Sequence, residues 1–559
     1  MKRKLEEILR GVLESCFEQG ALARTEVPDF VVEVPNNPEH GHFATNLALT
    51  LAASQKRPPR EIAGVIAEWI QGYEDLIESV DIAGPGFLNF VIRLREWHRA
   101  LCEAVSLGPD YGRSTMGRGK KILVEFVSAN PTGPLHLGHG RGAALGDSLC
   151  RILAFSGHDV EREFYINDAG AQVRLLGESI YARWRRRRDT EYPFPEKGYR
   201  GPYIDDLASE MEPETAHLEG LEVEEAVERC ADFGRARMLE EIKRDLEEFR
   251  TGFDTWFSER DLVASGALNE ALEGAKERGE LYERDGAWWI QTTAYGDDKD
   301  RVIRKNDGEF TYFATDIAYH LNKWGRGFTG AVNIWGADHH GYVKRVKAAL
   351  AAAGLAPDWL SVLLIQLVKL WQGGEEVRMS KRAGNYVTLK ELIEEVGVDS
   401  ARFIFLIKNH DSPLDFDLDL AKRRDSDNPV YYVQYAHARI CSVFRKAAEA
   451  GVDFPDNTLE AVKGLRLEEE AGLIRLLTRF PDLVEEVSRN FEPHRLTYYL
   501  TDLAAAFHKY FNLGTKMPEC RILAEDVHLS KARLCLAAGI REVLRTGLWL
   551  LGVNAPEKM

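Results

Sequence analysis

Two closely spaced histidines are the most suggestive chemical feature of the sequence. His136-Leu137-Gly138-His139 ends a stiff Pro- and Gly-containing loop that follows the apolar run 121–127. If a helix begins here, a spacing of three places both imidazoles on one face, and Gly138 lets a flat base or ribose approach the backbone. Free N–H groups at a helix N-terminus favour phosphate, so the loop predicts a nucleotide site. The alternative is a pair of structural histidines at a helix cap.

Alternating strands and helices would have to position this loop. Apolar runs typical of strands occur at 121–127, 159–166, 331–335 and 362–368. Helical patterns between them include 140–156 and 342–353. Such alternation indicates an α/β fold with a parallel sheet that helices cover on both faces.

The regions outside these alternating segments have different hydrophobic patterns. The N-terminal part mixes helical segments with short apolar runs, at 1–18, 30–34, 59–70, 87–92 and 95–105, and ends in a Gly-rich linker at 108–119. Residues 201–280 are rich in Glu and Leu at helical spacing, which predicts an acidic helical insertion between two halves of the sheet. Beyond about residue 430 the pattern indicates a bundle of amphipathic helices, at 431–450, 466–489, 495–512 and 529–551.

Composition limits the classes of protein. The chain has 559 residues, 45% hydrophobic and 29% charged, which excludes a disordered or membrane-spanning protein and allows about three or four domains. The net charge of −17 arises in residues 201–300, which hold 28 acidic and 11 basic residues, so the charge does not exclude an RNA partner. Seven scattered cysteines without a CxxC pair, and no signal-peptide core, predict a cytoplasmic protein without a thiolate zinc site.

A second motif makes the first far more specific. Arg378-Met379-Ser380-Lys381-Arg382 lies about 240 residues further along the chain, just after the strand candidate 362–368. The two motifs, in this order and context, resemble the signature sequences of class I aminoacyl-tRNA synthetases. Longer segments resemble the bacterial arginyl-tRNA synthetases across essentially the whole chain, among them EFVSANPTGPLHLGHGRGAALGD, YINDAGAQ, MSKRAGNYVTL, NPVYYVQYAHAR and LLGVNAPEKM.

The resemblance implies a domain plan. It comprises an N-terminal α+β domain that contacts the tRNA elbow, a Rossmann-like catalytic domain with an acidic insertion, a connector and an all-α anticodon-binding bundle. We place these at 1–115, 116–400 with the insertion at about 185–295, 401–430 and 431–559.

The resemblance also implies an activity. The expected reaction is the ATP-dependent activation of L-arginine and its transfer to the 3′-terminal adenosine of tRNA(Arg), with AMP and pyrophosphate released. Mg²⁺ is expected to accompany ATP, and no protein-bound zinc or membrane contact is expected. The resemblance further implies a monomer.

Site residues follow from the family's motifs. Catalysis is assigned to His136, His139 and Lys381, and ATP binding to these three with Gly138, Met379 and Ser380. Arg378 and Arg382 replace the first lysine and the last serine of the family's second motif, and they retain positive charge. The arginine substrate is assigned to Glu125 at its α-amino group, to Asn130 and His136 at its carboxylate, to Tyr312 and Asp316 at its guanidinium, and to Asp338 at the sheet end. Carboxylates suit a guanidinium because it offers five donors and stays charged.

Several alternatives remain open from the sequence. Asp338-His339-His340 could bind a metal, Asp415–Asp419 could be a calcium loop instead of a connector, and Arg183–Arg188 could contact RNA or form a solvated helix end. At the level of function, the rivals are another class I synthetase and a non-catalytic tRNA-binding relative.

Overall fold

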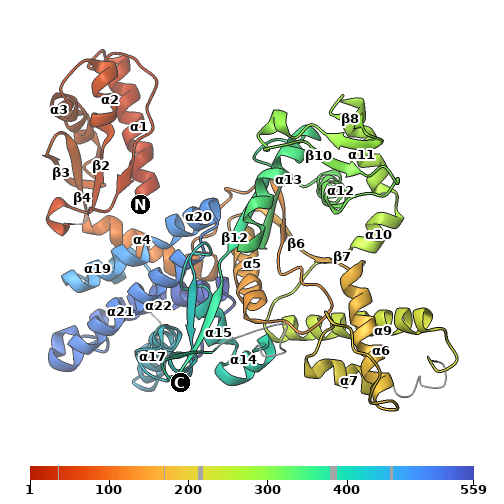
Figure 1. Cartoon of the computed structure of the whole chain (residues 1–559). Coiled ribbons are helices and arrows are strands. Elements are labelled where there is room, and N and C mark those ends of the chain that lie inside the picture. The colour runs from red at the N-terminus through yellow and green to blue at the C-terminus, as the bar shows by residue number, and fades with distance from the viewer. Residues whose placement is uncertain (36, 169, 212–217, 378–386, 454–456) are drawn as a thin grey trace.

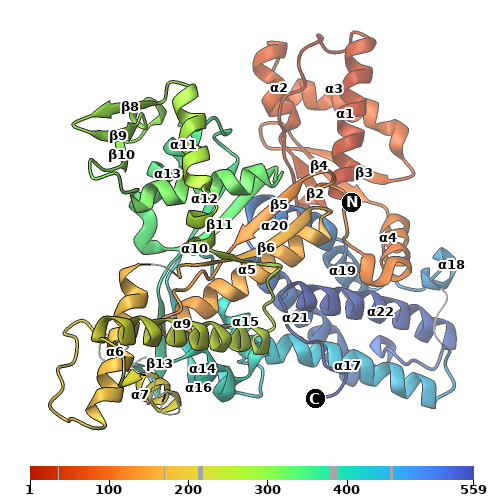
Figure 2. The same cartoon turned by 90° about the vertical axis from the view of Figure 1, so that its right-hand side faces the viewer.

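The computed structural model describes residues 1–35, 37–168, 170–211, 218–377, 387–453 and 457–559. Within these ranges the strands form four sheets. Figure 1 shows a separate N-terminal body joined through one helix to the rest of the molecule, and Figure 2 shows the bundle beneath it.

The N-terminal body is an antiparallel sheet packed against three helices. Its strands lie in the order β1-β2-β4-β3. The elements are α1 (Lys2–Glu18), β1 (Val32–Glu33), β2 (Phe43–Thr45), α2 (Leu47–Gln55), α3 (Pro59–Ile70), β3 (Ile77–Ala83) and β4 (Phe87–Ile92). In α1 the buried residues Leu5, Leu9 and Val12 recur every three to four positions, which explains the amphipathic pattern of 1–18. The next helix, α4 (Leu94–Leu107), leaves this body and packs against the C-terminal bundle.

The central sheet is parallel throughout, as the alternating pattern predicts. Its order is β12-β11-β5-β6-β7. The strands are β5 (Lys121–Glu125), β6 (Asp159–Ile166), β7 (Thr255–Ser258), β11 (Gly330–Gly336) and β12 (Leu360–Ile365).

Three helices cover the two faces of this sheet. They are α5 (Leu137–Phe155), α12 (Tyr312–Gly325) and α13 (His340–Ala352). Val124 shares a buried cluster with α5, whereas Leu123 shares one with α12 and α13. Because side chains alternate along a strand, Glu125 lies on the same face as Leu123, toward α12. The small residues of α5 permit close packing, since a Cβ at Gly146 would lie 2.2 Å from the Phe126 ring.

Two long segments are inserted along the chain between elements of the central sheet. Between β6 and β7 lie α6 (Ala171–Arg186), α7 (Pro202–Glu210) and α9 (Val223–Glu248). Between β7 and α12 lie α10 (Glu259–Ala264), α11 (Ala267–Glu277), β8 (Leu281–Arg284), β9 (Ala287–Ile290) and β10 (Arg301–Arg304).

The helical insertion expected at 201–280 is therefore only partly confirmed. It holds for α7, α9, α10 and α11, but β7 lies within this range and pairs with β6 as the outermost strand of the central sheet. The sequence pattern did not reveal β7 because it has only four residues, all partly buried, and shows no alternation.

A small three-stranded sheet and three short helices connect the central sheet to the bundle. They comprise β13 (Val368–Gln372), β14 (Glu375–Val377), α14 (Leu389–Val396), α15 (Val398–Phe405), β15 (Leu414–Asp417) and α16 (Leu418–Lys422). The acids of 415–419 serve this connection. Asp417 caps α16 through the N–H groups of Asp419 and Leu420, and Asp415 accepts the Trp371 indole N–H at 3.2 Å. These contacts favour the connector over the calcium loop.

The C-terminal bundle consists of helices. They are α17 (Pro429–Glu449), α18 (Leu459–Val462), α19 (Glu468–Leu477), α20 (Phe480–Asn490), α21 (His494–Lys516) and α22 (Val527–Leu550). The single helix expected at 466–489 is wrong, because α19 ends at Leu477 and α20 begins at Phe480. Pro481 in the first turn of α20 lacks the N–H that a continuous helix would need.

One buried ion pair ties these parts together. Arg402 of α15 and Asp147 of α5 are both fully buried, with Arg402 Nη2 2.5 Å from Asp147 Oδ2. The same guanidinium donates to the carbonyl of Phe249 at the end of α9 and to that of Leu551 just after α22. A single side chain thus joins the signature helix, the insertion, the connector and the C-terminus.

We predict that Arg402→Met lowers the free energy of unfolding by about 3–5 kcal/mol, because it leaves Asp147 buried without its closest cation. Urea unfolding followed by circular dichroism measures the change. The control is Arg113→Met, whose partner Asp110 and own side chain are more than half exposed, and it should cost at most about 1 kcal/mol. Equal losses in the two variants would contradict a special role for Arg402.

Candidate active site

The two signature histidines cap the N-terminus of α5. His136 Nδ1 accepts the backbone N–H groups of Gly138 at 3.1 Å and of His139 at 3.4 Å. His139 Nδ1 accepts the N–H of His136 at 3.3 Å, and the two rings stack with centroids 3.7 Å apart. The pair is therefore a helix cap, as the structural alternative had it. Because both Nδ1 atoms accept, neutral rings carry their protons on Nε2, a donor of the kind that pairs with phosphate or ribose oxygen.

The backbone just before this loop is strained. Val127 and Ser128 have φ angles of 67° and 40°, in the left-handed region that a β-branched residue rarely adopts. Such strain costs about 1–3 kcal/mol per residue and is typical of functional sites. Here it turns the chain away from β5, so that the Ser128 hydroxyl donates to Glu125 Oε1 at 3.0 Å.

Glu125 ends β5 and is almost fully buried. Its Oε2 accepts Lys323 Nζ at 2.6 Å, a contact from α12. Burial alone would raise the pKa of Glu125, but the charge and hydrogen bond of Lys323 outweigh it and hold the pKa below its usual value. The carboxylate is therefore ionised at neutral pH.

Asp316 lies near Glu125 but lacks such a partner. Its partly buried carboxyl accepts the Tyr342 hydroxyl of α13. Burial raises the pKa of Asp316 to about 7, the Tyr342 hydrogen bond opposes this rise, and the charges of Glu125 and Glu259 add to it. Among the described residues no lysine, arginine or histidine forms an ion pair with Asp316, so it is a carboxyl that an incoming cation would stabilise.

Glu259 is a further carboxyl at this end of the site, and the sequence did not reveal it. It begins α10 directly after β7, is buried, and hydrogen-bonds the Tyr165 hydroxyl. Burial raises the pKa of Glu259, and this hydrogen bond partly opposes the rise. Its position after a strand of the central sheet is the signal that could have identified it, but β7 itself was not recognised.

Three other residues expected to bind arginine do not lie with Glu125 and Asp316. They are Tyr312, Asn130 and Asp338. Tyr312 begins α12 and is 70% exposed, so its ring lies at the rim rather than inside with Asp316. Asn130 follows the strained turn and donates to Gln172 of α6 at 2.6 Å. Asp338 is exposed after β11, with His339 Nε2 3.7 Å away.

The second motif, including Met379, Ser380 and Lys381, lies outside the described residues, as does Arg378. The chain that follows it contacts the first motif directly. Leu389 N–H donates to the carbonyl of Leu135 at 2.8 Å, and Thr388 forms a bridge with His136. The segment that follows the second motif is thus joined to the first motif at the start of α5 and of α14.

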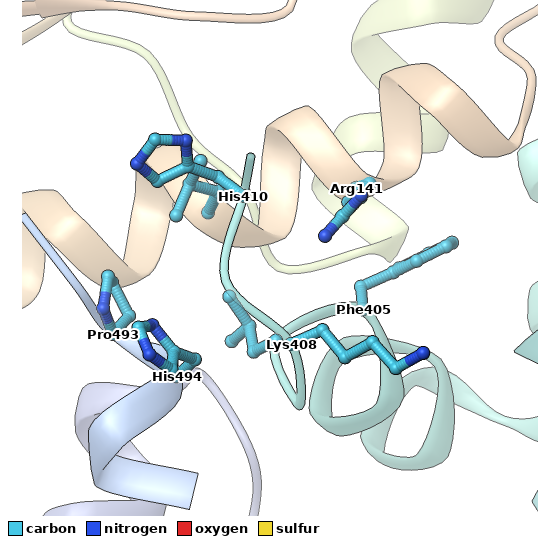
Figure 3. A pocket seen from close by; sticks show the side chains of 8 residues that line it. Arg141, Phe405, Lys408, His410, Pro493 and His494 are labelled. Atoms are coloured by element: carbon cyan, nitrogen blue, oxygen red, sulfur yellow. The ribbon is translucent and has the colours of Figure 1, made fainter. Parts of the chain in front are cut away.

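Two cavities lie beside helices that pack on the central sheet, one beside α13 and one beside α5. A groove of about 600 Å³ runs along α13 beside β12, and His340, Lys344 and Lys347 on its wall suit a chain of phosphates. A much smaller cavity, of about 10 Å³, lies where α5 meets the start of α21. Figure 3 shows side chains that line it, among them Arg141, Lys408, His410 and His494. It has room for a single water at most. Arg141 is held there by the carbonyls of Gln366, Asn409 and Ser412, which fixes α5 to the connector.

The arginine cluster at 183–188 takes part in packing within the insertion. Arg183 and Arg186 lie over the Phe194 ring, and Arg188 lies over Trp184. Arg183 also pairs with Asp205 at 3.5 Å. These contacts favour a structural role for the cluster over a solvated helix end.

The described part of the chain holds neither a cluster of potential metal ligands nor a membrane-spanning helix. No group of three or more His, Cys, Asp or Glu residues there is arranged to hold a metal ion. None of the helices there is both long and apolar enough to cross a bilayer.

Three family descriptions match successive parts of the chain. Residues 3–92 match the arginyl tRNA synthetase N terminal domain, residues 103–422 the catalytic domain of class I (R) tRNA synthetases, and residues 433–559 the DALR anticodon binding domain.

Relatives match from end to end. The arginine–tRNA ligase of Desulfosudis oleivorans is 48% identical over 567 residues and that of Syntrophotalea carbinolica 47% over 560, each with 100% of both chains covered. The solved structure of Thermus thermophilus arginyl-tRNA synthetase matches with a TM-score of 0.77 at 26% identity, again over 100% of both chains. With the signature histidines, the parallel sheet and the carboxyls around α12 in place, these matches show that the chain belongs to the arginyl-tRNA synthetases of class I.

Proposed function

We propose that the chain is an arginine–tRNA ligase that activates L-arginine with ATP and charges tRNA(Arg). The observation that carries this proposal is the set of acids around α12. Glu125 is ionised, whereas Asp316 and Glu259 have raised pKa values and form no ion pair with any described residue. A substrate with an ammonium at one end and a guanidinium at the other matches that set.

In the first step, a carboxylate oxygen of arginine attacks the α-phosphorus of ATP. A bond forms between them, the bond from the α-phosphorus to the bridging oxygen breaks, and pyrophosphate leaves. His136 and His139 offer Nε2 donors at the N-terminus of α5, whose dipole favours phosphate. We assign Gly138 to the close approach of the nucleotide, because it has no side chain. A Cβ there would also crowd the His136 ring, at 3.0 Å.

In the second step, a hydroxyl oxygen of the terminal adenosine attacks the activated carbonyl carbon and forms an ester bond. The bond from that carbon to the phosphate oxygen breaks, AMP leaves, and the hydroxyl proton is released. Lys381, with Met379 and Ser380, is proposed to stabilise the phosphate charge in the first step, on the basis of the motif alone. Mg²⁺ is proposed to enter with ATP, held mainly by phosphate and water oxygens, where it neutralises phosphate charge.

Recognition of arginine is assigned residue by residue. Glu125 receives the α-ammonium, Asn130 and His136 hold the carboxylate end, and Asp316 with Glu259 binds the guanidinium. Tyr312 on the rim is proposed to cover the bound side chain, and Asp338 to contact the substrate from the end of β11.

The remaining regions are assigned to tRNA. We propose that residues 1–115 contact the tRNA elbow, that 116–400 with its insertion at 185–295 form the catalytic domain, and that 401–430 connect it to an anticodon-binding domain at 431–559. The protein is further proposed to act as a cytoplasmic monomer.

The activity is tested by ATP–pyrophosphate exchange in the presence of tRNA(Arg). L-Arginine should drive the exchange, and the product should be arginyl-tRNA. Omitting tRNA is not a test, because this family commonly requires tRNA for activation. Exchange driven by lysine or glutamate in place of arginine would contradict the proposal.

Arginine binding should depend on pH through Asp316. Its pKa is raised to about 7 without substrate, and a guanidinium favours the ionised form, so affinity should increase as the pH rises through 7. Calorimetry should give a Kd for arginine about tenfold lower at pH 8 than at pH 6.

Asp316→Asn should bind arginine more weakly and with little pH dependence. Asp358→Asn, which changes an exposed acid of the loop before β12, is the matched control and should keep the profile of the unmodified protein. A profile that survives in Asp316→Asn would contradict the role of this carboxyl.

A further inference from the structure

Two glutamates lie side by side beneath the proposed arginine site. Glu125 of β5 and Glu163 of β6 are partners across the parallel pair, and both are buried. Two adjacent buried carboxylates would repel each other, and the loss of hydration would destabilise each of them strongly unless it were compensated.

Helix α12 supplies a separate cation to each of them. Lys323 Nζ lies 2.6 Å from Glu125 Oε2, and Arg326, at the end of the helix, places Nη2 2.5 Å from Glu163 Oε2. The Tyr319 hydroxyl also donates to Glu163 Oε1 at 2.6 Å. Of the two glutamates, Glu125 stands next to the signature loop, through its contact with Ser128. The cations also differ, because Lys323 is fully buried, whereas Arg326 is partly exposed and lies 3.6 Å from Glu161 as well.

Lys323 is fixed by a chain of hydrogen bonds that leads back along its own helix. Its Nζ donates to Asn333 Oδ1 at 3.1 Å, and Asn333 Nδ2 lies 2.9 Å from His320 Nε2. His320 Nδ1 lies 2.7 Å from the backbone carbonyl of Asp316. Lys323, Asn333 and His320 are all buried.

The direction of each bond in this chain can be assigned. Burial lowers the pKa of His320 to about 4, so its ring is neutral at physiological pH. A carbonyl only accepts, so Nδ1 carries the proton and Nε2 accepts from the amide of Asn333. Asn333 Oδ1 is then turned toward Lys323, which has no acceptor of its own.

We propose that Lys323 is a positioning residue for arginine binding. It keeps Glu125 ionised and aimed at the substrate's α-ammonium, and through Asn333 and His320 it ties that end of the site to the turn of α12 that carries Asp316. The inference rests on the proposed role of Glu125. One rigid helix then sets the distance between the groups that hold the two cationic ends of arginine.

The other groups around Glu125 do not replace this lysine. From α12 it faces Tyr319, neutral His320 and Asp316, and from β6 it faces Tyr165 and Glu163. The turn after β5 contributes the Ser128 hydroxyl. Among these groups, Lys323 is the cation that contacts Glu125, and the neighbouring cation Arg326 is engaged by Glu163.

The test is to measure the Kd of L-arginine by calorimetry from pH 6 to pH 9, for Lys323→Met and for the unmodified protein. The quantity compared is the ratio of the two Kd values, variant over unmodified protein, at each pH. Without the lysine, a buried Glu125 should ionise only at higher pH. The ratio should be about tenfold or more at pH 6 and should fall to about threefold or less at pH 9. Arg326→Met is the matched control, since it removes the cation from Glu163 in the same layer, and its ratio should not change with pH.

A double variant keeps the test usable if Lys323→Met does not fold. Glu125→Gln with Lys323→Met leaves no unpaired charge, and it should bind arginine as weakly as Glu125→Gln alone, because Lys323 acts through Glu125. A further loss of about tenfold in the double variant would overturn the inference, as would a ratio for Lys323→Met that is flat with pH. If Glu125→Gln itself binds arginine normally, the assigned role of Glu125 fails and the inference fails with it.

Discussion

The compensation of acids on the α12 side of the central sheet is the constraint on which the site depends. Glu125 and Glu163 obtain their cations from within the fold, from Lys323 and Arg326. Asp316 and Glu259 form no ion pair among the described residues, and burial raises the pKa of both. An unpaired acid in such surroundings costs several kcal/mol if it is ionised, and a bound guanidinium would remove that cost. We propose that the imbalance between the two pairs of acids marks where the cationic side chain of the substrate binds.

The rest of the architecture holds these acids in a fixed position relative to the signature loop that contains His136 and His139. Period-two alternation in β5 sends Glu125 toward α12 and Val124 toward α5, so one strand serves both parts of the site. The strained turn at Val127 and Ser128 then leads into the histidine cap of α5. Asp147 on that same helix is bound by Arg402, whose other contacts reach the end of α9 and the C-terminus. The signature helix is therefore anchored through Arg402 to the helical insertion, the connector and the C-terminus.

The sequence was most informative where local pattern and chemistry coincide. The His-x-Gly-His loop, the parallel strands at 159–166 and 331–335, and the helical bundle after 430 could all be predicted, because each has a strong periodicity or a specific motif. The break between α19 and α20 was missed although Pro481 marks it, since the apolar spacing continues across it.

Residues whose role depends on tertiary contacts could not be predicted. Lys323 occupies a position in an amphipathic helix where a lysine would ordinarily be solvated, and only the structure shows that it is fully buried against Glu125. Glu259 was hidden for a related reason, because its importance follows from β7, a strand too short to recognise. Tyr312 and Asp316 share a helix at a spacing of four, yet one lies on the rim and the other inside, a difference that spacing alone does not express.

We propose that the uncompensated carboxyls of Asp316 and Glu259 select a cationic side chain. Calorimetric titration of the full chain at pH 8 with L-arginine and with L-citrulline, a neutral molecule of nearly the same shape, tests it most directly. Arginine should bind at least about a hundredfold more tightly, because citrulline would leave Asp316 and Glu259 without a cation and short of donors. Affinities for the two ligands within about threefold of each other would contradict the account.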